Sequence, residues 1–220
     1  MISLDVDAIL RAQGADPSRI RARSPRLVTI AERARREGSP LIAPAVASRR
    51  LVVTELTHRA LIFSTGERLS APLIAHECAA ATELVVLVAT IGAALEDASA
   101  HAMRDDPAFA LALDGLGTAA VESLANAERA RLAGEMSALS SFAGPALSPG
   151  MDGWPLEPGQ REIFALLSGN ELPVRLLESG MMHPRKSLSF VIGLGPAMNA
   201  RASHCDHCGS RERCRHRRAG

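Results

Sequence analysis

The chain has 220 residues, enough for one substantial domain with its own hydrophobic core and a small additional segment. With 47% hydrophobic and 22% charged residues its composition is that of a globular protein, and a net charge of +1 favours neither nucleic acid nor an anionic membrane as a partner. Aromatic residues make up only 3%, and tyrosine is absent, which disfavours a stacking platform for single-stranded nucleic acid.

The N-terminal sequence favours a cytoplasmic location. Asp5 and Asp7 stand where a secretory signal peptide carries Lys or Arg, and no long apolar segment follows them. The longest apolar run, residues 84–91, is much shorter than the roughly 20 residues that span a bilayer. We therefore expect no membrane partner.

Residues 1–40 are predicted to form an N-terminal helical segment with helices over 6–13 and 25–36. Asp5 or Asp7 is expected to cap the first helix. Eight arginines fall within this segment. They indicate a solvated helix face, and the alternative is a docking surface for an acidic partner or for the phosphate of a cofactor.

Residues 41–198 alternate short strands with helices and are predicted to form an α+β core. Strands are expected over 51–56, 60–64, 83–89 and 187–192, and helices over 73–81, 93–104, 107–139 and 160–167. The run 83–89 is apolar on both faces, which predicts a central strand covered by helices. We expect a break in the long helix at residues 115–117, and a loop over the proline-rich segment 140–159.

The segment Leu147–Leu156 is the strongest local candidate for a binding loop. Its prolines fix the backbone angle φ, and Gly150 and Gly153 allow backbone geometry closed to other residues. Such a loop holds amide N–H and C=O groups in place, as an adenine or an amino-acid carboxylate requires. The alternative is a rigid connector between a strand and a helix.

Four short motifs in chain order carry a resemblance to a known family. They are Val88-Ala89-Thr90-Ile91-Gly92, then Asp114-Gly115-Leu116-Gly117, then the Ser-Pro-Gly and Trp-Pro-Leu loop with Gln160, and finally Pro184-Arg185-Lys186-Ser187-Leu188-Ser189. Together they span residues 83–195, and this part of the chain resembles the activation domain of cobalamin-dependent methionine synthase. The resemblance implies a twisted antiparallel sheet with flanking helices. It also implies that this chain is a stand-alone form of the domain.

The resemblance also implies a site for S-adenosylmethionine. The loop lies against this methyl donor, the acidic residue on the long helix receives its α-amino group, and the Pro-x-x-Ser-x-Ser segment lies near the corrin of a partner protein. The residues that correspond in this chain are Glu122, Ser148, Pro149, Gly150, Met151, Lys186 and Ser187. No side chain is expected to act as an acid, base or nucleophile, because the cofactors carry the chemistry.

The loop departs from the family at two positions. Ala146 stands where the family usually has an arginine, and Met151 where it usually has a tyrosine. The arginine would supply a charged hydrogen bond of roughly 1.5–3 kcal/mol to a carboxylate. Its loss favours weaker binding of S-adenosylmethionine, or a different ligand.

The basic tail, residues 199–220, is predicted to bind a metal. Two intervening residues let the thiolates of Cys205 and Cys208 reach one ion, with Cys214 as a third ligand and His216, or alternatively His204 or His207, as a fourth. Three thiolates and one imidazole suit zinc, whereas an iron–sulfur cluster usually takes four cysteines and would need Cys78. The alternative is a disordered tail.

These patterns predict a subunit that supports the reductive reactivation of a cobalamin-dependent methyltransferase. Its expected partners are a cobalamin-binding methyltransferase subunit and a flavin or iron–sulfur reductase. Two alternatives remain: a non-catalytic adaptor for a corrinoid protein, and a small metal- or redox-binding protein.

Overall fold

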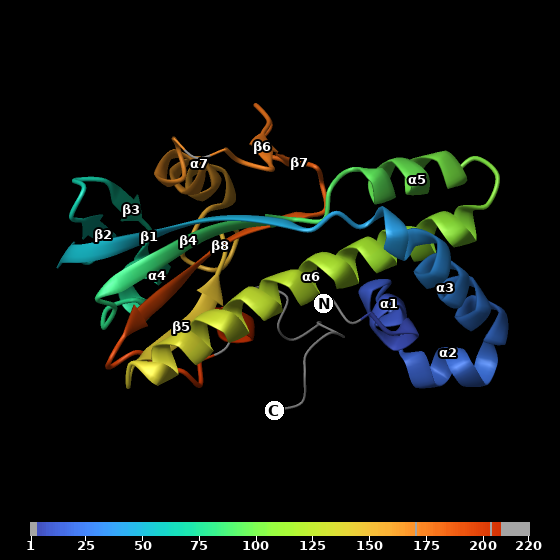
Figure 1. The fold of residues 1–220 in the computed structure, drawn as a ribbon, viewed down its shortest axis with the longest axis horizontal. Helices are drawn as coiled ribbons and strands as arrows, with labels where there is room; N and C mark the ends of the chain where they lie inside the picture. Colours follow the sequence, from blue (N-terminus) through green and yellow to red (C-terminus); the bar gives the residue numbers. More distant parts are fainter. Residues whose placement is uncertain (1–3, 170, 203, 208–220) are drawn as a thin grey trace.

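The computed structural model describes residues 4–169, 171–202 and 204–207, without the side chains of His204 and Cys205. A six-stranded sheet lies at its centre, in the order β3-β2-β1-β4-β8-β5 with every neighbouring pair antiparallel (Figure 1). Its strands are β1 (Ala45–Leu56), β2 (Ala60–Phe63), β3 (Arg68–Ser70), β4 (Glu83–Thr90), β5 (Phe142–Leu147) and β8 (Ser187–Gly195). The strands β6 (Arg175–Leu176) and β7 (Met182–His183) form a separate pair. The expected α+β class with an antiparallel sheet and flanking helices is confirmed.

Helices cover both faces of this sheet. The long helix α6 packs on one face, where Leu132 and Met136 meet Phe190 and Ile192. Helices α4 and α7 cover the other face, where they share a core with β4 and β8. The helices are α1 (Val6–Ala12), α2 (Pro17–Arg23), α3 (Pro25–Gly38), α4 (Pro72–Glu77), α5 (Ala94–Ala102), α6 (Pro107–Ala138) and α7 (Leu156–Leu166), with 3-10 turns η1 (Ser39–Leu41) and η2 (His204–His207).

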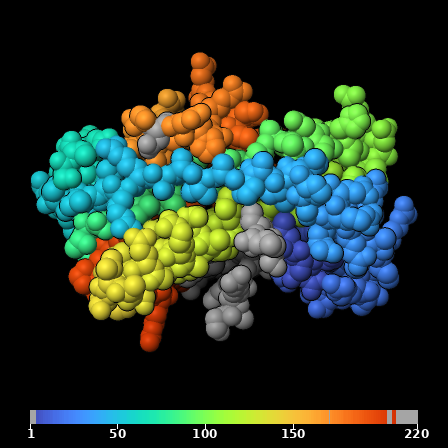
Figure 2. Space-filling view, in the orientation of Figure 1, coloured from blue at the N-terminus to red at the C-terminus, as the bar shows by residue number. Residues whose placement is uncertain are grey.

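A third core lies beyond one end of the sheet. Helices α1, α3 and α5 surround the N-terminal half of α6, and Ile9, Leu95 and Leu116 are buried among them. Figure 2 shows the N-terminal helices and α5 at the end of the molecule opposite β2 and β3. The helices predicted over 6–13 and 25–36 are observed as α1 and α3, and Asp5 caps α1 by accepting a hydrogen bond of 2.6 Å from the Ala8 N–H. Helix α2 was not predicted, because none of its residues is buried and it therefore carries no apolar period.

The central strand was predicted correctly. The strand β4 lies between β1 and β8, and every residue of it after Glu83 is buried. A strand with two buried faces needs apolar side chains at consecutive positions, which is the pattern of 84–89.

The loop predicted over 140–159 is shorter in the structure, and the prediction was wrong at both of its ends. Residues 142–147 form the edge strand β5, which pairs with β8 and has an irregular register between Ala143 and Ala146. Pro145 lies at this irregularity, and an edge strand tolerates a proline because one of its sides needs no N–H donors. The loop also ends early, since α7 starts at Leu156.

The expected break in α6 was wrong as well, because Gly115 and Gly117 permit close packing within an unbroken helix. A Cβ atom on Gly115 would lie 3.0 Å from the carbonyl oxygen of Ile9 in α1 and 2.7 Å from the Cγ of Gln13. A Cβ atom on Gly117 would lie 3.2 Å from the Cγ of Lys186. Glycine here lets α1 and the start of β8 approach the helix.

Helix α6 is also long and apolar enough to cross a membrane, alone among the helices of the described chain. In this fold 56% of the 18-residue stretch of α6 that meets this criterion is buried. A core helix that covers a sheet has the same composition.

We predict opposite effects of one substitution at two glycines of α6. Gly115→Ala is expected to lower the free energy of unfolding by about 1–3 kcal/mol, because the backbone of α1 must move. The matched control Gly134→Ala, whose Cβ meets nothing within 4 Å, is expected to raise it by about 0.5–1 kcal/mol through helix propensity. Urea denaturation measures both, and equal effects at the two sites would contradict the close approach of α1.

Candidate functional site

Segments from the four sequence motifs meet at the start of β8. The carbonyl oxygen of Lys186 accepts a hydrogen bond of 3.2 Å from the Ile91 N–H, which follows β4. The Lys186 Nζ lies 2.8 Å from the Asp114 Oδ1 on α6. On the opposite side of the sheet, the hydroxyl of Ser189 donates a hydrogen bond of 2.8 Å to the Oε1 of Gln160 on α7. One short stretch of β8 therefore joins residues that are far apart in the sequence.

The side chain of Lys186 is held against α6. Its ammonium also donates a hydrogen bond of 2.9 Å to the Thr118 Oγ1, and the side chain is 19% exposed. Asp114 and Thr118 are four residues apart and lie on one face of the helix. The carboxylate of Asp114 compensates the charge of Lys186 in this arrangement, so the lysine serves as a link between helix and sheet.

The residues before and after Lys186 are fixed by polar contacts too. Ser187 is buried, and its hydroxyl donates a hydrogen bond of 2.6 Å to the carbonyl oxygen of Pro184. The backbone N–H and the Nε of Arg185 donate to the two carboxylate oxygens of Glu96 on α5, at 2.8 and 3.1 Å. The turn that leads into β8 is thereby tied to α5 and α6.

The pair Gln160 and Ser189 is buried, with 5% and 3% of the two residues exposed. A buried amide or hydroxyl without a partner costs roughly 1–3 kcal/mol. The hydrogen bond between them therefore fixes the position of α7 on the sheet, and α7 carries the end of the proline- and glycine-rich loop.

The loop that starts at Ser148 is braced from within. Gly150, with a φ of +95°, donates its N–H to the carbonyl oxygen of Trp154 at 2.7 Å. The side chain of Met151 packs against the core, and its sulfur accepts a hydrogen bond of 3.4 Å from the Ser148 N–H. A Cβ atom on Gly159 would lie 2.9 Å from the Cβ of Pro149, so α7 passes close to the loop. The predicted rigidity of this segment agrees with these contacts.

Glu122 lies on α6, one helical turn after Thr118, and its side chain is exposed. No hydrogen bond or ion pair is formed by its carboxylate within the described part of the chain. Ala125, almost one turn further on, packs in the cluster that includes Ala146 of β5. Glu122 therefore lies on the stretch of α6 between the Lys186 link and the strand that leads into the loop.

Two surface pockets, of about 730 and 670 Å³, are lined by other elements. The first lies between α1, α2 and α3, and the second between α3, α5 and the start of α6. Neither is lined by Glu122, Lys186 or residues 148–151. The role of these residues in holding a methyl donor remains a prediction.

The predicted metal ligands fall largely outside the described residues. Cys208, Cys214 and His216 lie beyond His207, and the side chain of Cys205 is not described. In the described part of the chain no three His, Cys, Asp or Glu side chains are grouped to hold a metal.

The start of the tail does fold back against the candidate loop. The carbonyl oxygen of His207 accepts a hydrogen bond of 3.2 Å from the Asp152 N–H. The Nε2 of His207 lies 3.4 Å from the Oε2 of Glu77, at the end of α4.

Cys78 is poorly suited to be a fourth cluster ligand. Its thiol is buried, and a Cβ atom on Gly193 would lie 3.1 Å from its sulfur. Burial, together with the neighbouring carboxylate of Glu77, raises the pKa of Cys78 to about 12. Metal binding needs the thiolate, which this environment disfavours.

Sequence reasoning missed Thr118 and Glu96, the partners of Lys186 and Arg185. Thr118 follows Asp114 by four residues on one helix face, a spacing that the sequence contains. Glu96 is separated from Arg185 by 89 residues, so that only the fold shows the contact.

No protein-family model matches the chain, and no curated protein matches it. The solved structures include a similar fold described as the "Crystal Structure of the MetH Reactivation Domain bound to AdoHcy". Its TM-score is 0.64 at 14% sequence identity, and the alignment covers 87% of this chain and 71% of that one. The chain therefore has the fold of the methionine synthase reactivation domain.

We predict that the Gln160–Ser189 hydrogen bond couples α7 to the sheet. Ser189→Ala and Gln160→Leu are each expected to lower the free energy of unfolding by about 1–3 kcal/mol, because each leaves one buried polar group unpaired. The double variant is expected to lose less than the sum of the two single losses, since both partners are then apolar. Strict additivity in a urea-denaturation cycle would show that the pair contributes no coupling.

Proposed function

We propose that this protein supports the reductive reactivation of a cobalamin-dependent methyltransferase of the methionine synthase type by holding S-adenosylmethionine. The observation that supports it best is the convergence of the four motif segments at the start of β8, within a fold similar to that of a reactivation domain bound to AdoHcy. AdoHcy is what remains of S-adenosylmethionine after methyl transfer. A fold that holds one is a suitable frame for the other.

In this proposal the chain positions the donor and its partners carry the chemistry. S-adenosylmethionine supplies a methyl group to the cobalt of a partner-bound cobalamin after a reductase has supplied an electron. The carboxylate of Glu122, which has no ion pair within the described residues, binds the α-amino group of the donor. The braced backbone around Pro149 and Gly150 lies along the donor, and such fixed groups lose little entropy on binding.

A second candidate function, a non-catalytic adaptor for a corrinoid protein, is favoured by the loop itself. Met151 is turned into the core, and Ala146 has no group that can pair with a carboxylate. The adaptor would keep the docking surface of the fold without binding the donor.

The test is a transfer assay with the full chain. The protein is mixed with a corrinoid-binding methyltransferase, a reductant and S-adenosylmethionine labelled in its methyl group. We expect label on cobalt only in the presence of this chain. Absence of transfer with an otherwise active partner would exclude the donor-holding function, and complex formation without transfer would favour the adaptor.

Binding is tested separately by calorimetry with S-adenosylhomocysteine. Glu122→Gln is expected to weaken binding by about tenfold or more, which corresponds to the loss of one charged hydrogen bond. Glu32→Gln on α3 removes another exposed helical carboxylate and is expected to leave the affinity unchanged. Equal affinities for wild type and Glu122→Gln would remove Glu122 from the site.

We further propose that the tail binds one metal ion through Cys205, Cys208, Cys214 and His216. Elemental analysis after purification is expected to show about one zinc per chain, as a set of three thiolates and one imidazole would hold. The variant Cys205→Ser/Cys208→Ser is expected to lose the metal, whereas Cys78→Ala keeps it. A brown protein that contains iron and sulfide would instead indicate a cluster.

A further inference from the structure

The pocket between α3, α5 and the start of α6 combines an apolar floor with an acidic rim. Its volume is about 670 Å³, and Leu41, Ala98, Ala102 and Leu113 contribute apolar surface. Four carboxylates line it against a single guanidinium, that of Arg33. The pocket therefore has an excess of negative charge beside a surface that favours apolar groups.

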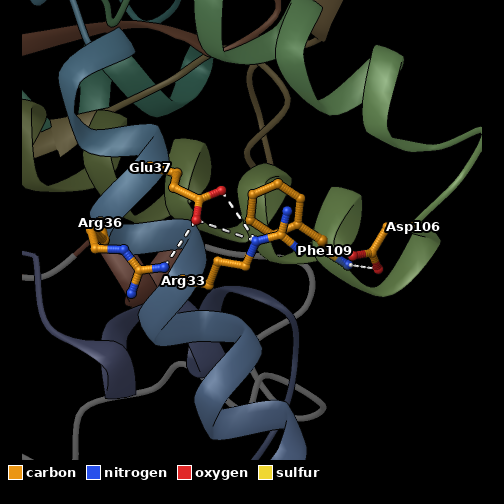
Figure 3. A network of polar contacts seen from close by, with 5 residues as sticks. All are labelled: Arg33, Arg36, Glu37, Asp106 and Phe109. Carbon is orange, nitrogen blue, oxygen red and sulfur yellow. Dashed lines mark hydrogen bonds and ion pairs between the residues drawn. The ribbon is translucent and has the colours of Figure 1, made fainter.

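The guanidinium of Arg33 is already paired with two carboxylates of the pocket (Figure 3). It stacks on the ring of Phe109 at 3.8 Å, and its nitrogens lie 3.1 Å from Glu37 and 2.9 Å from Asp106. A hydrogen bond from Arg36, followed by the hydrogen bond from Arg33, holds the pKa of Glu37 below its usual value. This network satisfies two of the four carboxylates in the pocket.

The other two carboxylates, Asp97 and Asp105, are left for a ligand. Both are exposed, and neither has a hydrogen bond or ion pair from its carboxylate within the described residues. Asp97 lies in the first turn of α5, and Asp105 lies between the C-terminal end of that helix and Asp106, the N-cap of α6. Two open carboxylates, with the apolar surface of Ala98 and Ala102 between them in sequence, fit a segment that carries basic side chains on both sides of an apolar one.

We propose that this pocket docks a basic segment of a partner protein, in which one basic side chain meets Asp97, a second meets Asp105 and an apolar side chain between them covers Ala98 and Ala102. Phosphate groups of nucleic acids or lipids are disfavoured because they would meet like charges. The pocket adjoins the candidate site, since Glu96 on the same helix holds Arg185. A partner bound here would lie next to the start of β8, and this docking does not depend on the proposed function.

The test measures fluorescence anisotropy of a short labelled peptide of alternating leucine and arginine, added to the full chain. We expect Asp97→Asn/Asp105→Asn to weaken binding by about tenfold, as the loss of two exposed charge pairs implies. The charge-matched control Glu55→Gln/Glu171→Gln, which removes exposed carboxylates elsewhere, is expected to bind like wild type. A peptide of alternating serine and arginine is expected to bind more weakly, because it cannot cover the floor.

Three results would overturn the proposal. They are equal binding by both double variants, equal binding of the leucine and serine peptides, and full competition by spermine at the same concentration of charge. The last result would identify a small amine as the ligand of the pocket. Circular dichroism of each variant verifies that the fold is retained.

Discussion

The link between Lys186 and helix α6 is the contact on which the arrangement of this protein depends. The ammonium of Lys186 meets Asp114 and Thr118, while its carbonyl oxygen binds the end of β4. The long helix is thereby fixed across the sheet at the point where β8 begins, and Gly117 lets the lysine stem approach. The neighbouring Arg185 attaches α5 to the same turn. Two helices and two strands thus share one anchor.

Much of the fold could be predicted because its signals are local. The continuous apolar run of β4 follows from the burial of both faces of this strand. The helical period of apolar residues in α6 follows from the packing of this helix against the rest of the core. Both elements were predicted. Strand β5 was missed because Pro145 is acceptable only at a sheet edge, and edge position is decided by distant residues. Gly115 was misjudged for a similar reason, since its partner Ile9 is more than 100 residues away. Of the candidate site, the sequence indicated the segments but not the contacts that join them.

The candidate site and the acidic pocket share helix α5. Helix α5 presents Glu96 toward the start of β8 and Asp97 toward the pocket, on successive residues. A partner seated in the pocket would therefore contact the helix that holds the turn around Arg185.

Trp154 is an intrinsic fluorescent probe of the loop. It is the only tryptophan, and the chain has no tyrosine, so near-ultraviolet emission comes from one indole. That indole is 1% exposed between the loop and Gly159, and its Nε1 has no hydrogen-bond partner within the described chain. We therefore expect its emission to be that of an indole in a dry, apolar environment. Any ligand or partner that moves the loop away from α7 changes the spectrum of a single fluorophore, without the need for a label.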